Sequence, residues 1–292
     1  MSKISIIAVC YNHSKYVIET LESILLQDDP SLDIMIIDDC STDDSFDKIF
    51  SWLSVRQLNW RLFRNEINLG VSKTLNFSVR HISGDYIKFI SCDDVLMPGA
   101  INNLSSFLKK QNNDCCMVFG DMEVIDETGE TISPSYLLEN NFTPEILKES
   151  LYLNLAKKCF VPAPATMIRK SVFNEFKFNE ELYFEDWDFW LQLSKSYTFK
   201  YLNKRVVKYR KLHNSLFHAL SIKLRCSLMK MAHQNLAYNK QADNFFKAII
   251  IENAMINFIN HGPNSSLWLW RRFTYTLRFR DFYYFSKSLI FH

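Results

Sequence analysis

The chain has 292 residues, of which 48% are hydrophobic and 15% aromatic, with only 6 Gly. This composition supplies enough apolar surface for a large folded domain and excludes a disordered chain or a fibrous repeat. The formal net charge is +2 and is unevenly spread: residues 217–292 carry 10 Lys/Arg against 3 Asp/Glu, and residues 1–216 carry 24 against 29. An acidic front and a basic tail predict two parts with different tasks.

The first 120 residues alternate two patterns. Apolar, β-branched runs indicate buried strands, and apolar residues three or four apart indicate amphipathic helices. The expected strands are 4–10, 34–37, 60–63, 86–90 and one beginning at 117–119; helices are expected around 18–25, 46–53, 75–82 and 101–108, with Ser72 as an N-cap and Pro98 at a first helical position. This alternation predicts an α/β fold with a mostly parallel sheet between helices.

The rest of the chain divides at about residue 216. Residues 134–164 are predicted to form a loop with a helix near 143–155, followed by strands at 165–168 and 199–209 around a helix at 187–194. Apolar residues at helical spacing dominate beyond that point. We therefore expect a catalytic domain over residues 1–215 and a helical, basic and aromatic extension over residues 216–292.

The seven Cys are scattered and form no C-x-x-C pair. Their odd number, and the lack of a secretory apolar segment, favour reduced thiols and a cytoplasmic protein. No apolar run reaches the ~20 residues that a membrane-spanning helix needs.

Acidic pairs follow two of the expected strands. Asp38-Asp39 closes the second strand and Asp93-Asp94 closes the fourth, while Tyr11 follows the first. Ligands of open α/β sheets bind at this edge, where carboxylates repel each other unless a cation or donor compensates them. Such a pattern favours a divalent cation, Mn²⁺ or Mg²⁺, and a phosphate-bearing ligand. The alternative is that both pairs cap turns and helices, with Tyr11 a rim aromatic.

In order and spacing, several segments resemble the family-2 glycosyltransferases of the GT-A fold. They are SIIAVCYNHSKYVIETLESILLQ, DIMIIDDCSTDDS, NEINLGVSKTLNFSVRHISGDYIKFISCDDVLMPG, FEDWDFWLQLS and YRKLHNS, which together span roughly residues 3–215. The resemblance implies a metal-assisted inverting glycosyltransferase with a nucleotide-sugar donor, UDP being the expected carrier. It implies a Rossmann-like, mostly parallel sheet flanked by helices, to which the helical extension is added.

The resemblance also implies a role for individual residues on the donor side. Val9 and Tyr11 would line the nucleotide base, Asp39 would accept a uracil N–H, Asp38 would support that turn, Lys73 would approach the pyrophosphate, Asp93 would face the ribose, and Asp94 would bind the metal. Many relatives carry a further Asp where this chain has Ser91. His213 aligns with a His that some relatives bring to the metal or phosphates, although Leu212 lengthens the usual spacing by one residue.

Glu185-Asp186 matches the catalytic acidic pair of the family, with Asp186 as the general base. The alternative is an acidic helix start, which the helix dipole favours. Crowding of Glu185, Asp186 and Asp188 among aromatic residues should raise a carboxyl pKa, which suits a base. The implied acceptor is a hydroxyl of a saccharide or of a lipid-linked oligosaccharide, as in surface-polysaccharide synthesis.

Residues 263–292 interleave ten Trp, Phe and Tyr residues with four Arg. Three interpretations compete: a helix packed on the catalytic domain or on a second subunit of a homo-oligomer, a peripheral contact with the inner face of the cytoplasmic membrane, or single-stranded nucleic-acid binding, which nothing upstream supports.

Two other classes of protein fit parts of the pattern. A metal-binding phosphoacceptor module also clusters Asp residues, but it is far shorter and its acidic pair follows the first strand. A non-catalytic nucleotide-sugar-binding protein would share the binding residues, but the Glu185-Asp186 pair argues against it.

Overall fold

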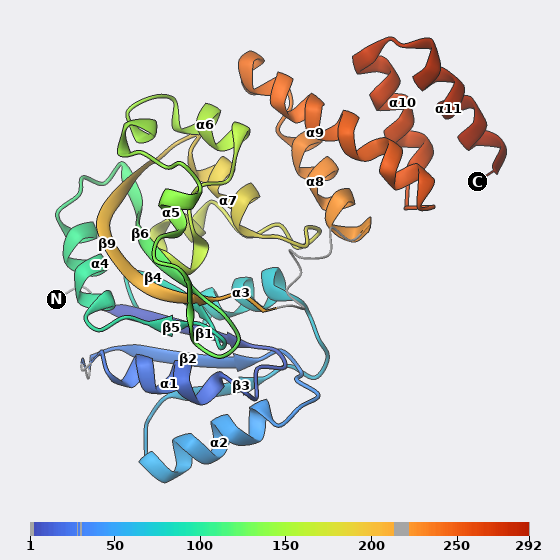
Figure 1. The fold of residues 1–292 in the computed structure, drawn as a ribbon. Helices are drawn as coiled ribbons and strands as arrows, with labels where there is room; N and C mark the ends of the chain where they lie inside the picture. The colour runs from blue at the N-terminus through green and yellow to red at the C-terminus, as the bar shows by residue number, and fades with distance from the viewer. Residues whose placement is uncertain (1–2, 28, 30, 213–221, 292) are drawn as a thin grey trace.

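The computed structural model describes residues 3–27, 29, 31–212 and 222–291. Its centre is a mixed, mostly parallel sheet with the strand order β3-β2-β1-β4-β8-β6-β9-β5, to which β7 adds by pairing with β6 (Figure 1). The strands are β1 Ile4–Cys10, β2 Asp33–Asp38, β3 Arg61–Arg64, β4 Tyr86–Ser91, β5 Val95–Leu96, β6 Cys115–Ile125, β7 Thr131–Ser133, β8 Thr166–Arg169 and β9 Thr198–Arg210. The predicted α/β architecture is confirmed.

The N-terminal half of the sheet is parallel. Strands β3, β2, β1 and β4 run side by side, and Val9 pairs with both Ile37 and Ser91. The chain therefore leaves these strands at one edge, where Cys10, Asp38 and Ser91 end neighbouring strands. The connecting helices are α1 Val17–Leu25, α2 Ser45–Arg56, α3 Val71–Arg80 and α4 Ala100–Lys109.

Two predicted helix starts are wrong. Gly70 is the N-cap of α3, so Ser72 lies inside the helix, and Gly99 is the N-cap of α4, so Pro98 precedes that helix. Both Gly residues have a positive φ, 80° and 71°, which other residues adopt only with strain. Backbone conformation, rather than the side chain that could cap, decides where these helices begin.

The C-terminal half of the sheet is mixed. Strand β8 pairs antiparallel with β4 and β6, β9 runs parallel to β6, and the end of β9 pairs antiparallel with the two-residue β5. The helix predicted near 143–155 is divided, because Ser150 caps a new helix by accepting the N–H of Leu153. The helical segments here are α5 Tyr136–Glu139, η1 Pro144–Leu147, α6 Leu151–Lys157, η2 Ala163–Ala165, η3 Lys170–Asn174 and α7 Asp186–Leu193.

Hydrophobic cores lie on both faces of the sheet. Alternate residues of β1 show the division: Ile6 and Ala8 pack with α1, α2 and α4, while Ile7 packs with α3 and with the residues before and within α7. Because both faces are covered, the central strands read as continuous apolar runs, and this pattern made them predictable.

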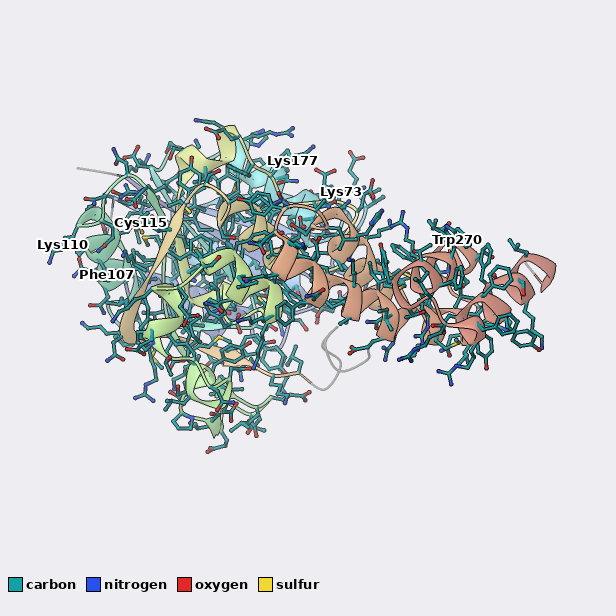
Figure 2. The ribbon with its side chains drawn as sticks, turned by 90° about the horizontal axis from the view of Figure 1, so that it is seen from above. Lys73, Phe107, Lys110, Cys115, Lys177 and Trp270 are labelled. Carbon is teal, nitrogen blue, oxygen red and sulfur yellow. The ribbon has the colours of Figure 1, made fainter. Side chains whose placement is uncertain are left out.

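Four helices complete the chain: α8 Ile222–Gln234, α9 Lys240–Ile259, α10 Ser265–Thr276 and α11 Phe279–Phe291. Helix α9 contacts α6 and α8, whereas α10 packs on α9 and α11, so the last two helices lie away from the sheet (Figures 1 and 2). Arg272 and Asp281 form a buried ion pair between α10 and α11. None of the helices in the described ranges is long and apolar enough to cross a membrane. The expected boundary at residues 215/216 falls outside those ranges.

Candidate functional site

The loops after β1 and β2 are tied together at the carboxyl edge of the sheet. The side chain of Asn12 accepts the N–H of Thr42 at 2.8 Å, and Ser41 Oγ accepts the N–H of Asn12 at 2.9 Å. Asn12 and Cys40 have φ values of 57° and 62°, so each loop turns sharply just past its strand. The turns leave Tyr11 and His13 beside the acidic residues that end the neighbouring strands.

Asp38 and Asp39 are both buried, and both organise loops. Asp38 Oδ2 accepts the N–H of Ser41 at 3.0 Å and lies 3.3 Å from the guanidinium of Arg64. The carboxylate of Asp39 accepts one hydrogen bond from the amide of Asn65 and two from the backbone N–H groups of residues 69 and 70, at 2.7–2.9 Å. Asp39 therefore shapes the entry to α3, and its direct contact with a base stays a prediction.

Asp94 is a buried carboxylate without a full set of partners. Its Oδ1 accepts the backbone N–H of Arg210 at 2.9 Å, while its Oδ2 has no hydrogen-bond partner among the described residues. Burial and the neighbouring charge of Asp93 raise the pKa of Asp94 well above its usual range. Lys88 is fully buried nearby, but its ammonium donates to two backbone carbonyls, and burial lowers its pKa to about 7.

His13 lies next to Asp93, with 3.8 Å between its Nε2 and the Oδ2 of that carboxylate. Burial favours the neutral imidazole, but the hydrogen bond with Cys10 and the charge of Asp93 together raise the pKa of His13. The Cys92 thiol, hydrogen-bonded to Cys10, lowers the pKa of the Cys10 thiol to about 6. Both His13 Nδ1 and Asp93 Oδ1 are buried without a hydrogen-bond partner in the part of the chain described.

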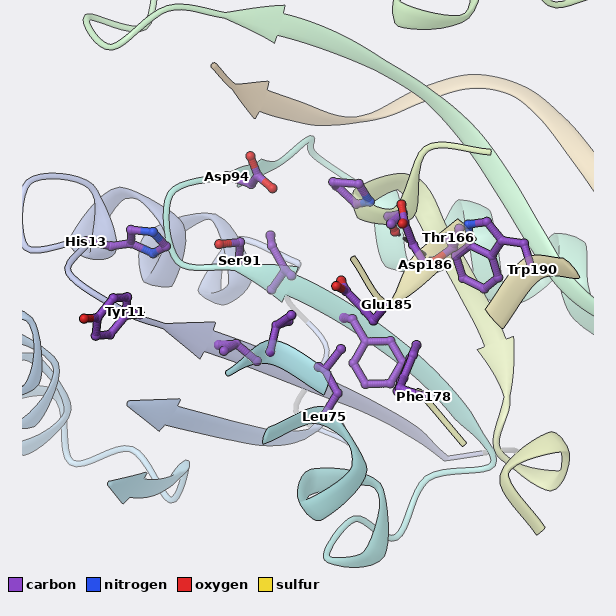
Figure 3. A pocket seen from close by; sticks show the side chains of 16 residues that line it. Tyr11, His13, Leu75, Ser91, Asp94, Thr166, Phe178, Glu185, Asp186 and Trp190 are labelled. Atoms are coloured by element: carbon purple, nitrogen blue, oxygen red, sulfur yellow. Dashed lines mark hydrogen bonds between the residues drawn. The ribbon is translucent and has the colours of Figure 1, made fainter. Parts of the chain in front are cut away.

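A pocket of about 220 Å³ joins this edge to the start of α7 (Figure 3). Asp94, His13 and Tyr11 stand at one end of it, and Glu185 and Asp186 at the other. The middle of the wall is largely apolar. The lining residues are Val9, Tyr11, His13, Val71, Leu75, Phe89, Ile90, Ser91, Asp94, Ala163, Pro164, Thr166, Phe178, Glu185, Asp186 and Trp190.

Glu185 and Asp186 form the start of α7 and are partly exposed. Burial, followed by the charge of Asp186, raises the pKa of Glu185 to about 8. Burial also raises the pKa of Asp186, although the backbone N–H of Trp187 donates to its Oδ1 at 2.7 Å and opposes the rise. Asp188, the third acid of this segment, is buried and accepts a hydrogen bond from the amide of Asn235, which directly follows α8, so it links α7 to the end of α8.

A second, larger pocket of about 750 Å³ meets the first at Ala163, Pro164, Glu185 and Asp186. Its other walls come from β6, α5, the end of α6, the segment before α7, the end of β9 and α8. The catalytic pair predicted from the sequence therefore lies on the wall between two cavities. The first cavity reaches Asp94, and the second extends between α5, α6 and α8.

The structure brings most of the predicted site residues together, with two exceptions. Val9, Tyr11, Asp94, Glu185 and Asp186 line one pocket. Asp93 adjoins it through His13, and Asp38 and Asp39 support the loops beside it. Lys73 is exposed on the first turn of α3 and is not among the lining residues, and His213 lies outside the described residues.

Three residues that the sequence analysis missed also shape the site: His13, Lys88 and Arg210. Arg210 is 2% exposed, and besides its N–H to Asp94 its guanidinium bonds to Asp93 O at 2.9 Å and Glu19 Oε2 at 2.5 Å. Lys88 was detectable, as a lone cation inside an otherwise apolar strand.

Among the described residues, no group of three or more His, Cys, Asp and Glu side chains is arranged to hold a metal ion.

The fold is that of a GT-A glycosyltransferase. The sequence pattern of glycosyl transferase family 2 matches residues 5–176, more than half of the chain, and the chain belongs to that family. An uncharacterized glycosyltransferase of Methanocaldococcus jannaschii is 25% identical over 211 residues, which cover 71% of this chain and 70% of the relative.

Two solved structures share the fold. TarS of Staphylococcus aureus (residues 1–349, with UDP-GlcNAc) has a TM-score of 0.60 and 19% identity over 98% of this chain and 79% of its own. The mannosyltransferase PcManGT of Pyrobaculum calidifontis, in complex with GDP-Man and Mn²⁺, has a TM-score of 0.61 and 14% identity over 99% and 80%. The C-terminal helices α8–α11 lie within the matched regions of both comparisons.

Proposed function

We propose that this chain is an inverting glycosyltransferase that moves a sugar from a UDP-sugar to a hydroxyl of a saccharide or lipid-linked acceptor. One observation carries the proposal: the Glu185-Asp186 pair, with raised pKa values, stands on the wall between a pocket that reaches Asp94 and a second pocket. The donor occupies the first pocket, with its base between Val9 and Tyr11. UDP is the proposed carrier because the relative TarS binds UDP-GlcNAc.

Asp93 and Asp94 fit a divalent cation bound together with the donor. Each has a buried carboxylate oxygen without a hydrogen-bond partner among the described residues, and such hard oxygens are what Mn²⁺ and Mg²⁺ prefer. Two carboxylates suffice where substrate phosphates complete the coordination. When bound, the cation supplies positive charge that offsets the departing diphosphate. PcManGT binds Mn²⁺, which supports the same assignment by analogy.

Asp186 is the proposed general base. The acceptor enters through the larger pocket, and its hydroxyl gives its proton to Asp186 as the oxygen forms a bond to the anomeric carbon. The bond from that carbon to the diphosphate breaks at the same time, so the configuration inverts and no sugar is held covalently by the protein. A raised pKa improves a carboxylate as a base, provided that it is still ionised at the working pH.

Lys73 and His213 are proposed to approach the donor phosphates. Lys73 sits on the first turn of α3, whose positive N-terminal end is next to the loop held by Asp39. Lys73 is exposed, and its flexible side chain would turn to a phosphate of the bound donor.

The test is release of nucleoside diphosphate over time from a panel of nucleotide sugars, with and without Mn²⁺. We expect turnover of a UDP-sugar that depends on Mn²⁺ and falls by at least about 100-fold in Asp186→Asn, while UDP still binds. Binding without turnover across the panel would instead indicate a nucleotide-sugar-binding protein. Near-normal turnover in Asp186→Asn would refute the assignment of the base.

We further propose that α10 and α11 contact an anionic membrane surface, where lipid-linked acceptors reside. Over residues 263–289, the exposed charges are all positive, and the one acid, Asp281, is buried with Arg272. Aromatic side chains are exposed in the same segment: Phe279 is 83% exposed, and Tyr283 and Trp270, which Figure 2 labels, are each more than 40% exposed. Trp, Tyr and Arg suit the headgroup zone of a bilayer.

Flotation with vesicles that contain phosphatidylglycerol tests this contact. The full chain should float, and the chain without residues 263–292 should not. The double variant Arg278→Gln/Arg280→Gln should float less, since each basic residue near such a surface contributes about 1 kcal/mol. Equal flotation of all three proteins would exclude the contact.

A further inference from the structure

The larger pocket carries a charge that the proposed reaction does not use. Three lysines line it, Lys157 and Lys158 at the end of α6 and Lys211 just after β9, together with one acid beyond the catalytic pair, Glu139. The lysines come from two elements far apart in sequence, so the cluster is not the basic end of one helix. All three line only this pocket, and Lys211 directly follows Arg210, whose backbone N–H donates to Asp94.

None of the three lysines is neutralised within the described residues. No ion pair involves them: Lys157 Nζ donates to Asn154 Oδ1 at 3.2 Å and Lys158 Nζ donates to the carbonyl of Asn140 at 3.3 Å. The side chain of Lys211 makes neither an ion pair nor a hydrogen bond in the same ranges. Surface lysines are ordinary, but three unpaired ones around a single cavity produce a local positive potential that favours an anionic ligand.

The rest of the wall suits a sugar. Tyr136, Phe184, Trp187 and Tyr209 present aromatic surface to the same cavity. Trp187 is fixed in place because its Nε1 donates to the carbonyl of Leu155 at 2.8 Å. An aromatic wall with a few polar groups is the usual construction of a small-molecule site, and the volume of about 750 Å³ is within the range of such sites.

We propose that this pocket binds an acceptor that carries a phosphate ester, with the phosphate held by Lys157, Lys158 and Lys211 and the reactive hydroxyl directed to Asp186. The inference rests on the proposed function and specifies the chemical class of its acceptor. Two sources share this chemistry, a lipid-linked glycosyl phosphate and a soluble polyol-phosphate chain. A neutral saccharide would leave all three ammonium groups without a counter-charge.

The test compares glucose 1-phosphate with methyl glucoside, two probes that differ in the phosphate, on protein saturated with UDP and Mn²⁺ so that the donor side is blocked. Binding is measured by calorimetry, and protection of each lysine from acetylation by mass spectrometry. We expect glucose 1-phosphate to bind about tenfold more tightly, in line with charge-assisted hydrogen bonds, and to protect the three lysines. Lys157→Gln/Lys158→Gln and Lys211→Gln should each remove most of the preference.

Lys177→Gln is the matched control, because Lys177, labelled in Figure 2, is also exposed but is absent from the lining of both pockets. Equal binding of the two probes, or a preference that survives both lysine variants, would overturn the proposal, as would an equal loss in Lys177→Gln. Farnesyl phosphate in micelles and soluble poly(glycerol phosphate) are then compared as competitors of glucose 1-phosphate. The stronger competitor identifies which of the two sources the pocket prefers. UDP binding and donor turnover are recorded separately, so a failure of the donor chemistry is not confused with a failure of the acceptor site.

Discussion

The Glu185-Asp186 pair should carry one negative charge near neutral pH, and this makes its two members experimentally separable. With its pKa raised to about 8, Glu185 is only about one-tenth ionised at pH 7. Asp186 starts from a lower ordinary value and is raised by burial alone. We therefore expect Asp186 to act as the base while Glu185 remains protonated beside it.

Replacement of each carboxyl by its amide tests this division. Glu185→Gln keeps the shape and neutrality that Glu185 has at pH 7, so the turnover rate should stay within about threefold of the original. Asp186→Asn removes the base and should lower the rate by about 10²–10⁴, the usual contribution of general base catalysis. The assay is the initial rate of UDP release from the active donor, measured from about pH 6 to about pH 10 with UDP affinity as a control.

The pH dependence of the turnover rate is a second, independent test of this division of roles. Above about pH 8 the ionised Glu185 places another anion near the departing diphosphate, so the rate of the original enzyme should fall. Glu185→Gln cannot ionise and should lack this falling limb. A loss in Glu185→Gln as large as that in Asp186→Asn, or a falling limb that persists in Glu185→Gln, would refute the reasoning.

Three further predictions follow from buried charges. Asp94→Ala should weaken UDP binding by at least about tenfold in the presence of Mn²⁺ but little in its absence, as measured by calorimetry; equal effects in both conditions would contradict the metal assignment. Between pH 7 and the ordinary Lys pKa of 10.5, Lys88 is protonated in the unfolded chain but loses its proton on folding. In that window the free energy of unfolding of the original protein, measured by urea denaturation, should rise by about 1.4 kcal/mol per pH unit relative to that of Lys88→Met. The same pH dependence in both proteins would exclude a lowered pKa. Asp281→Asn leaves Arg272 buried without its partner and should destabilise the α10–α11 pair by about 3–5 kcal/mol, with faster hydrogen exchange confined to those helices; unchanged exchange would show that the ion pair contributes nothing.

The parallel half of the fold could be predicted from the sequence because its signals are local. Strands such as β1 and β2 are buried on both faces and appear as apolar runs, and the parallel arrangement then places Asp38 and Asp93 at one edge. Helix starts were less predictable: Ser72 has the chemistry of a cap, but the positive φ of Gly70 begins α3 earlier. Such conformational preferences compete within one or two residues, and only the folded backbone shows which prevails.

The contacts that complete the site are long-range, and the sequence contains no direct signal for them. Arg210 meets Asp94 because the two-residue β5 pairs with the end of β9, more than 100 residues further along the chain. Likewise, Asp39 was predicted to hold a base, yet it also holds the backbone N–H of Gly70 from a different loop. A carboxylate that orders a loop and one that binds a ligand have the same sequence signature.

The two pockets of the proposed site differ in charge, and this difference affects how the donor and the acceptor bind. On the donor side, nearby cations do not neutralise Asp94: the guanidinium of Arg210 is directed to Glu19 and to backbone carbonyls, and Lys88 also donates to carbonyls. An anionic donor without a cation would be repelled there, so we expect the metal and the donor to bind as a unit. The lysine-lined pocket favours an anionic ligand by its own positive charge and needs no metal to do so. We therefore expect the donor and its cation in one pocket and the phosphate-bearing acceptor in the other, with Asp186 between them.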